Sequence, residues 1–417
     1  MRDQTLWLIG YRTLSDLIAK GAFFLVTVMA ARRLSAEGFG VFALGSTMGW
    51  ILAVASDFGM QLHLSRAVAQ QPRGARRLPS GWLRIRLGTA FGGLTVFALG
   101  LVLTGAGGAY GPAILLLAIV YAVNGLTEFL SYFYRGLGRS DIESTLTVGQ
   151  RVGTLATATL VLWWSPGVTA LAFALLVPAT LTLAVSLWRA RHLSTAEPGS
   201  VDQRVAFAGS AGDVLPIGAG ILLSALYFRV DVLLIEVWNG PAAVGQYNAV
   251  FRLIEALRLF PAAVVAVTLP VLFRASDPRP LVKTSASVTL FGLGVALALW
   301  VVATPLIAQL YGPGFVDAVP AFRVLLLSFP LLSLNYVLTH QLIGWQGHRV
   351  YAGICLVALV LNVGLNAQLI PAQSIVGAAW ATVWTEVAIT VGCALALGRL
   401  VGVSRPTWRA LGKATSR

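Results

Sequence analysis

The sequence predicts an all-α integral membrane protein with about twelve transmembrane helices in two six-helix lobes, related by a parallel pseudo-two-fold repeat. Its 417 residues are 57% hydrophobic and 11% charged, whereas soluble domains carry roughly 25% charged residues. Apolar runs long enough to cross a bilayer recur along the chain, without the period-2 alternation of a membrane barrel. Basic residues gather in every second connection, which is typical of cytoplasmic loops.

The apolar runs predict each helix in turn. The first is interrupted by Arg12, Asp16 and Lys20, and no cleavable signal peptide is evident. In chain order, the expected spans are residues 6–31, 39–65, 83–104, 112–136, 142–163, 168–188, 210–238, 242–272, 284–310, 318–343, 350–370 and 375–399.

The charge of the connections predicts the orientation. The even-numbered connections and the tail hold almost all of the loop Lys and Arg, with Arg84 and Arg86 assigned to the second connection, whereas the odd-numbered connections offer only Arg32 and Arg33. This bias places both termini in the cytoplasm.

Two features divide the chain into halves. The longest connection contains a polar, turn-rich stretch, and it predicts an N-terminal lobe over 1–189, a cytoplasmic linker over 190–209, and a C-terminal lobe with a cytoplasmic tail over 210–417. The halves also echo each other. Ser35–Phe42 and Gly240–Tyr247 each place a glycine two residues before an aromatic at the start of a helix. Six spans per half give a parallel repeat, which predicts a two-lobed transporter with alternating access.

Charged residues inside the spans are the candidate functional groups. A charge in hydrocarbon costs on the order of 3 kcal/mol or more, so it usually faces protein or water. Arginine dominates lysine here, and guanidinium groups suit bidentate pairing with phosphate oxygens. We therefore predict an anionic, phosphate-bearing substrate, held in a central cavity by basic residues: Arg12, Lys20, Arg151, Arg229, Arg252 and Arg258.

The carboxylates in or beside the spans are candidates for ion coupling: Asp16, Asp57, Asp231, Glu255 and Glu386. The competing interpretation is that they only partner nearby cations or helix ends. Asp16 can pair with Arg12 and Lys20, and Asp16 and Glu255 can compete with the substrate for cations. The four histidines show no ligand spacing, so we expect no metal and no cofactor besides a proton or sodium gradient.

A set of short motifs extends over nearly the whole chain: Ala31–Gly40, Asp57–Met60, Tyr227–Ile235, Val244–Ala249, Leu269–Leu272, Tyr311–Phe315 and Gly377–Thr382. In their order and spacing they resemble the Wzx-type lipid-linked oligosaccharide flippases of the multidrug/oligosaccharidyl-lipid/polysaccharide (MOP) exporter superfamily. The resemblance implies a MOP/MATE-like fold with a V-shaped cavity. It also implies translocation of polyprenyl-diphosphate-linked oligosaccharides to the outer leaflet of a bacterial inner membrane, for polysaccharides such as O-antigen, lipopolysaccharide or exopolysaccharide. The implied partners are the lipid bilayer and a polysaccharide polymerase with its chain-length machinery, and no nucleic acid.

Two alternatives stay open. A multidrug/cation antiporter of the same fold would favour an acidic, aromatic pocket, which the arginines oppose. A membrane enzyme, either a polysaccharide polymerase or a glycosyltransferase, typically needs a large external loop or clustered external carboxylates. The predicted external connections offer little beyond Glu37 and Asp317. We therefore expect a transporter and no enzyme, and the residues do not identify the sugar.

Overall fold

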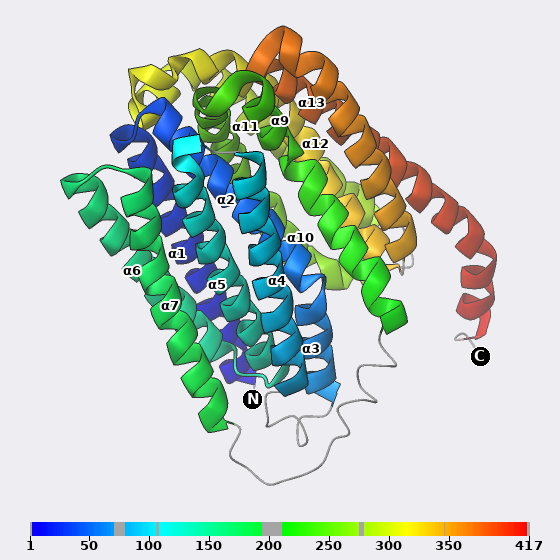
Figure 1. Cartoon of the computed structure of the whole chain (residues 1–417). Helices are drawn as coiled ribbons and strands as arrows, with labels where there is room; N and C mark the ends of the chain where they lie inside the picture. Colours follow the sequence, from blue (N-terminus) through cyan, green and yellow to red (C-terminus); the bar gives the residue numbers. More distant parts are fainter. Residues whose placement is uncertain are drawn as a thin grey trace. The chain divides into compact units, whose positions relative to one another are not determined.

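The computed structural model describes residues 2–70, 80–105, 108–193, 211–274, 279–345 and 347–414. All regular elements in these ranges are helical (Figure 1). They are α1 (Arg2–Arg33), α2 (Ala36–Asp57), α3 (Met60–Gln70), α4 (Ser80–Thr104), η1 (Gly108–Tyr110), α5 (Gly111–Gly136), α6 (Ser140–Trp164), α7 (Val168–Leu193), α9 (Ala211–Leu257), α10 (Leu259–Arg274), α11 (Arg279–Tyr311), η2 (Pro313–Ala318), α12 (Val319–Gly344) and α13 (His348–Ala414).

Nine helical stretches within the described ranges are long and apolar enough to cross a membrane. Two of them, Gly218–Thr268 and His348–Arg399, have 51 and 52 residues. At about 1.5 Å per residue, each exceeds twice the roughly 30 Å of a hydrocarbon core. Each also contains one non-helical residue, Gly240 in α9 and Ser374 in α13. Each stretch therefore supplies two crossings, divided where the sequence predicts a connection. The all-α membrane fold is confirmed.

The remaining predicted span corresponds to α6. This helix has 25 residues, which is about 37 Å at 1.5 Å per residue and sufficient for a crossing. It is more polar than the nine stretches above because Asp141, Glu143 and Arg151 lie within it. A twelfth crossing at α6 therefore stays a prediction.

Two of the predicted spans are not single continuous helices. The span expected over 39–65 is broken between α2 and α3, where Phe58 and Gly59 have φ of 44° and 81°. The Asp57 carboxylate stabilises this turn by accepting a hydrogen bond from the Gly59 amide, at 3.2 Å. The span expected over 242–272 is interrupted at Arg258, between α9 and α10. Hydropathy does not detect such breaks because the sequence on both sides of each break is mostly apolar.

The chain forms two compact units, Met1–Ala225 with Gly240–Gly245 and Leu226–Asn239 with Gln246–Arg417. Helix α9 contributes to both. The lobes expected over 1–189 and 210–417 stay predictions, since most of the expected linker at 190–209 lies outside the described residues. Its first four residues complete α7.

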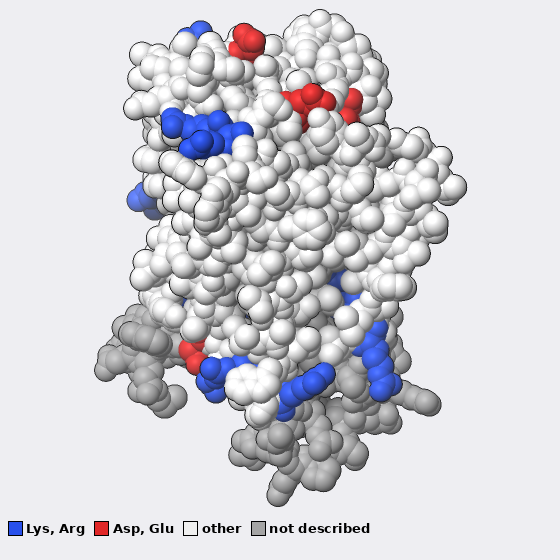
Figure 2. All heavy atoms as spheres, turned by 60° about the vertical axis from the view of Figure 1, so that its left-hand side comes forward, with Lys and Arg blue, Asp and Glu red and all other residues white. Residues whose placement is uncertain are grey.

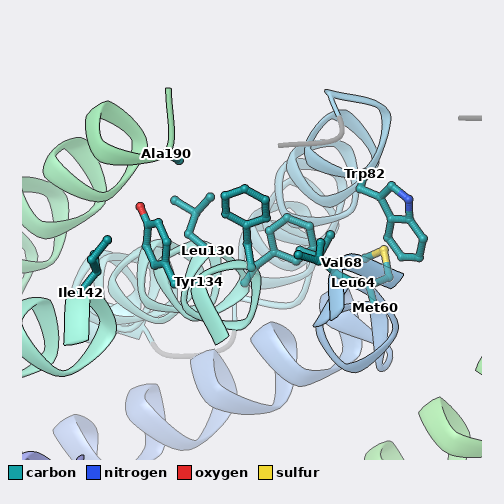
Figure 3. Close-up of a cluster of buried hydrophobic side chains, with 10 residues drawn as sticks. Met60, Leu64, Val68, Trp82, Leu130, Tyr134, Ile142 and Ala190 are labelled. Atoms are coloured by element: carbon teal, nitrogen blue, oxygen red, sulfur yellow. The ribbon is translucent and has the colours of Figure 1, made fainter. Parts of the chain in front are cut away.

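Helix α5 is central in the first unit, where it packs against α2, α3, α4, α6 and α7. Figure 3 shows the row of apolar side chains beside it, from Ile142 and Ala190 through Tyr134 to Leu64 and Trp82. The Tyr134 hydroxyl donates to the Ser186 carbonyl at 2.5 Å, so its polar atom is satisfied within the core. This packing fixes α5 as the support for the polar residues of the first unit.

Helix α12 has the same role in the second unit, where it packs against α10, α11 and α13. Leu338 and Leu342 of α12 meet Ile389 and Cys393 of α13 in one buried cluster. Val337 meets Val265 and Val288 in another.

The outward side chains suit a hydrocarbon environment. On α4, Phe91, Val96, Val102 and Leu103 are each more than 70% exposed. Figure 2 shows a surface that is largely uncharged, with most of the visible Lys and Arg side chains near its ends. A soluble protein rarely exposes apolar area on this scale. The chain is therefore a multipass membrane protein.

Candidate functional site

A cluster of charged side chains lies in the second unit, on the two arms of α9 that meet at the Gly240 kink. Arg229 belongs to the first arm, and Arg252 and Glu255 belong to the second. The Arg229 Nη2 donates to Glu255 Oε1, and the Arg252 Nη1 donates to Glu255 Oε2 at 2.7 Å. One carboxylate thus bridges two guanidinium groups with one oxygen each. The three-residue spacing puts Arg252 and Glu255 on the same side of their helix.

Aromatic rings lie beside the guanidinium groups of Arg229 and of a third arginine, Arg258. The Arg229 guanidinium carbon lies 5.0 Å from the centre of the Phe251 ring, and that of Arg258 lies 4.4 Å from the centre of Phe228. The two rings pack edge to face, 5.2 Å apart. Arg229 also donates to Asn248 Oδ1 at 3.3 Å. We call Arg229, Arg252, Arg258 and Glu255 the arginine cluster. It combines charge pairing with cation–π contacts, both of which stabilise charge away from water.

The other two predicted coupling carboxylates of this unit are buried beside neutral donors. Asp231 accepts hydrogen bonds from the Tyr247 hydroxyl at 2.6 Å and from the Val232 amide at 2.8 Å. Glu386 accepts from the Asn335 side-chain amide at 2.7 Å. Asn335 in turn accepts from Thr390 at 2.7 Å. Sequence reasoning named both carboxylates but missed their partners.

A second buried ion pair lies in the first unit. Arg86 of α4 is 1% exposed, and its Nε lies 3.5 Å from Asp57 Oδ1 at the end of α2. A Cβ atom at Gly125 of α5 would lie 2.8 Å from Arg86 Nη2, so only glycine leaves room for the guanidinium. The assignment of Arg86 to a cytoplasmic connection is therefore wrong. The available signal was Asp57, an acid inside a span that needs a basic partner.

The predicted basic residues of α1 and α6 also lie in the first unit. On α1, Arg12 is half-buried, while Asp16 and Lys20 are exposed, and no ion pair joins the three, all of them described residues. The half-buried Arg151 of α6 stands over Phe23 of α1 at 5.8 Å. The six predicted substrate-binding residues thus divide equally. Arg12, Lys20 and Arg151 belong to the first unit, and Arg229, Arg252 and Arg258 to the second.

Glu128 of α5 was not recognised as a candidate, although it lies within the predicted span over 112–136, and it is exposed. Among the described residues, no group of three or more His, Cys, Asp or Glu side chains is placed to hold a metal ion.

An all-helical membrane fold with charged clusters buried inside both of its units defines a polytopic protein of the transporter class. The family described as "Polysaccharide biosynthesis protein" matches residues 8–276, more than half of the sequence. The chain belongs to this family, which confirms the resemblance found in its motifs. A relative from Haloferax volcanii, "Probable low-salt glycan biosynthesis flippase Agl15", is 23% identical over 378 residues, covering 88% of this chain and 78% of that protein.

Solved structures share the fold at low sequence identity. "Lipid II flippase MurJ, inward closed conformation" matches with a TM-score of 0.73 and 12% identity, over 93% of this chain and 87% of that one. An inward-facing multidrug resistance MATE family transporter of the MOP superfamily matches with a TM-score of 0.75 and 16% identity, over 93% and 96%. The chain therefore has the MOP fold that its sequence predicts.

Proposed function

We propose that this protein is a flippase that moves polyprenyl-diphosphate-linked oligosaccharide repeat units from the cytoplasmic to the outer leaflet, for polysaccharide biosynthesis. The observation that carries the proposal is the arginine cluster, in which Arg229 and Arg252 converge on one carboxylate inside the membrane region. Membership of the polysaccharide biosynthesis family and the likeness to a protein named as a glycan biosynthesis flippase support it.

The physical reason is the charge of the lipid headgroup. A polyprenyl tail can stay in lipid while its diphosphate crosses a low-dielectric region, where lost hydration must be replaced. Guanidinium groups replace it with charge-assisted hydrogen bonds, and two that already hold a carboxylate have suitable geometry for phosphate oxygens. The flanking Phe228 and Phe251 rings keep the guanidinium groups in place without adding negative charge. This function requires no enzymatic step.

The proposal includes alternating access in a bacterial inner membrane with both termini in the cytoplasm, driven by a proton or sodium gradient. The candidate coupling carboxylates remain Asp16, Asp57, Asp231, Glu255 and Glu386. A polysaccharide polymerase with its chain-length machinery would use the flipped product.

Two exposed positions test the orientation. A cysteine replacing Lys283 should react only with cytoplasmic reagent, and one replacing Ala242 only with external reagent. The reverse pattern would overturn the orientation.

The decisive experiment deletes the gene and analyses the lipid-linked intermediates that accumulate. Cells without the protein should retain complete oligosaccharide repeats on diphosphate lipids in the inner leaflet, and the wild-type gene should restore export. Unchanged lipid pools after deletion would rule out the flippase.

The arginine cluster is tested by Arg229→Ala and Arg252→Ala, which should stop export in folded protein, whereas Lys at either site should give partial function. Lys283→Ala is the control, because Lys283 is exposed.

One observation favours a second candidate, a multidrug/cation antiporter. The fold matches a MATE transporter over 93% of this chain, and the exposed Glu128 is an acidic group within a span. An antiporter would make deletion strains sensitive to cationic drugs and leave their lipid-linked pools normal. The arginine cluster favours an anion, so we expect the opposite result.

A further inference from the structure

We propose that Glu255 is an internal counter-ion that occupies the place of the substrate's diphosphate, and that the headgroup binds by displacing it. The inference rests on the proposed function and assigns a specificity-determining role to Glu255. The two oxygens of its carboxylate hold separate guanidinium groups, those of Arg229 and Arg252. A diphosphate offers the same pair of guanidinium groups more oxygens and more negative charge.

The exposure of the three side chains gives the direction of approach. The side chains of Arg229 and Arg252 are 6% and 14% exposed, whereas that of Glu255 is 22% exposed. The carboxylate is thus the most accessible of these three side chains. We expect an approaching headgroup to reach Glu255 before the guanidinium groups of Arg229 and Arg252.

Two arginines of the cluster, Arg229 and Arg258, have supports that do not depend on Glu255. Arg229 keeps its bond to Asn248 and its contacts with Phe228 and Phe251 when the carboxylate moves away. Arg258 keeps its place over Phe228. Displacement therefore leaves Arg229 and Arg258 preorganised, and an incoming anion does not have to order these two donors.

The buried ion pair of Asp57 and Arg86 in the first unit lacks these properties. The Asp57 and Arg86 side chains are 9% and 1% exposed, and even a Cβ atom at Gly125 would lie 2.8 Å from Arg86 Nη2. The Arg135–Glu143 pair at the α5–α6 turn is local to that turn, since its residues lie eight apart in sequence. Glu255 alone, among these three carboxylates, both bridges two arginines and is accessible. Glu143 is therefore a suitable control for changes at Glu255.

An internal counter-ion explains how binding can be selective and still reversible. Release on the far side requires the diphosphate to leave, and a tethered carboxylate that returns to the arginines assists that step. Removing its charge should tighten binding and slow release. At an effective dielectric of 20 or above, a unit charge at a few ångströms changes anion affinity by about tenfold or more.

The test measures binding of geranylgeranyl diphosphate to the purified full chain in detergent by calorimetry, with geranylgeraniol as the uncharged probe. Glu255→Gln should bind the diphosphate about tenfold or more tightly than wild type and export polymer more slowly. Glu143→Gln should bind the diphosphate with wild-type affinity. All of the proteins should bind geranylgeraniol with the same affinity. Glu255→Asp, which keeps the charge but reaches fewer donors, should have intermediate affinity, and it decides the question if Glu255→Gln does not fold.

The possible failures are distinguishable. If neither Glu255→Gln nor Glu255→Asp binds more tightly while Arg229→Ala with Arg252→Ala abolishes binding, the counter-ion role is wrong and the diphosphate site stands. Binding of the diphosphate by the double arginine variant with wild-type affinity would instead overturn the site itself, and the role of Glu255 with it.

Discussion

Replacing Gly40 with alanine should lower the stability of the protein, although alanine ordinarily favours a helix. Gly40 lies in the first turns of α2, and Gly245 begins the second arm of α9. A Cβ atom at Gly40 would lie 1.6 Å from the Pro241 carbonyl oxygen and 3.0 Å from the Gly245 amide nitrogen. A Cβ atom at Gly245 would lie 2.3 Å from the Ala36 carbonyl oxygen. Two helices of the first unit thus cross backbone to backbone, at the two glycines of the sequence echo.

The magnitude follows from what the new methyl group meets. Both carbonyl oxygens belong to backbone, so no side-chain rotation can relieve the clash, and the helices must separate by roughly 2 Å to restore van der Waals contact. Overpacking costs about 1–3 kcal/mol, whereas replacing Gly by Ala inside a helix gains at most about 1 kcal/mol. We expect Gly40→Ala to destabilise the protein by about 2 kcal/mol, and Gly245→Ala to act in the same direction.

The assay is thermal unfolding in detergent, combined with polymer export in a deletion strain. Gly294 of α11 and Gly364 of α13 are matched controls, because a Cβ atom at either position meets nothing within 4 Å. Alanine at these controls should leave unfolding unchanged or raise its midpoint. Equal midpoints for Gly40→Ala and Gly294→Ala would refute the backbone contact as the reason for glycine at position 40.

The remaining predictions concern buried polar groups. Arg86→Ala leaves the Asp57 carboxylate buried without its cation and should destabilise the protein by about 3–5 kcal/mol, while adding Asp57→Asn should recover part of that loss in the same unfolding assay. Tyr134→Phe removes the bond to the Ser186 carbonyl and should lower stability by about 1–3 kcal/mol, with export by the folded protein unchanged. Tyr247→Phe removes a donor from the buried Asp231 carboxylate and should destabilise by a similar amount. An export defect in folded Tyr134→Phe would contradict its structural role.

The fold was largely predictable because hydropathy reports burial in lipid. The connections expected near residues 240 and 374 correspond to Gly240 and Ser374, where turn residues interrupt apolar runs. The break at Phe58 was not predictable, because Phe58 is apolar and adopts a left-handed backbone conformation that bulky side chains disfavour. It depends on the bond from the Gly59 amide to Asp57 and on Gly218 of α9, whose Cβ would lie 2.4 Å from the Phe58 carbonyl oxygen.

The candidate charges were predictable, but their partners were only partly so. The pairing of Arg252 with Glu255 follows from helical periodicity. The pairing of Arg229 with Glu255 joins residues 26 apart in sequence and requires the kink at Gly240. Arg86 was misassigned because basic residues near a helix end are normally attributed to a cytoplasmic loop, and only the packing of α4 against α2 shows otherwise.

The partners of the carboxylates differ in how firmly they hold each one. Asp57 faces the buried guanidinium of Arg86, and Asp231 is held by a tyrosine and a backbone amide, so movement of either would leave a buried group unpaired. Such groups favour a single conformation. Glu255 differs because its side chain is 22% exposed and one of its two arginines, Arg229, has other supports. A buried ion pair adds little net stability, so the convergence of Arg229 and Arg252 on Glu255 supports our proposal that this cluster exchanges its carboxylate for an anionic headgroup.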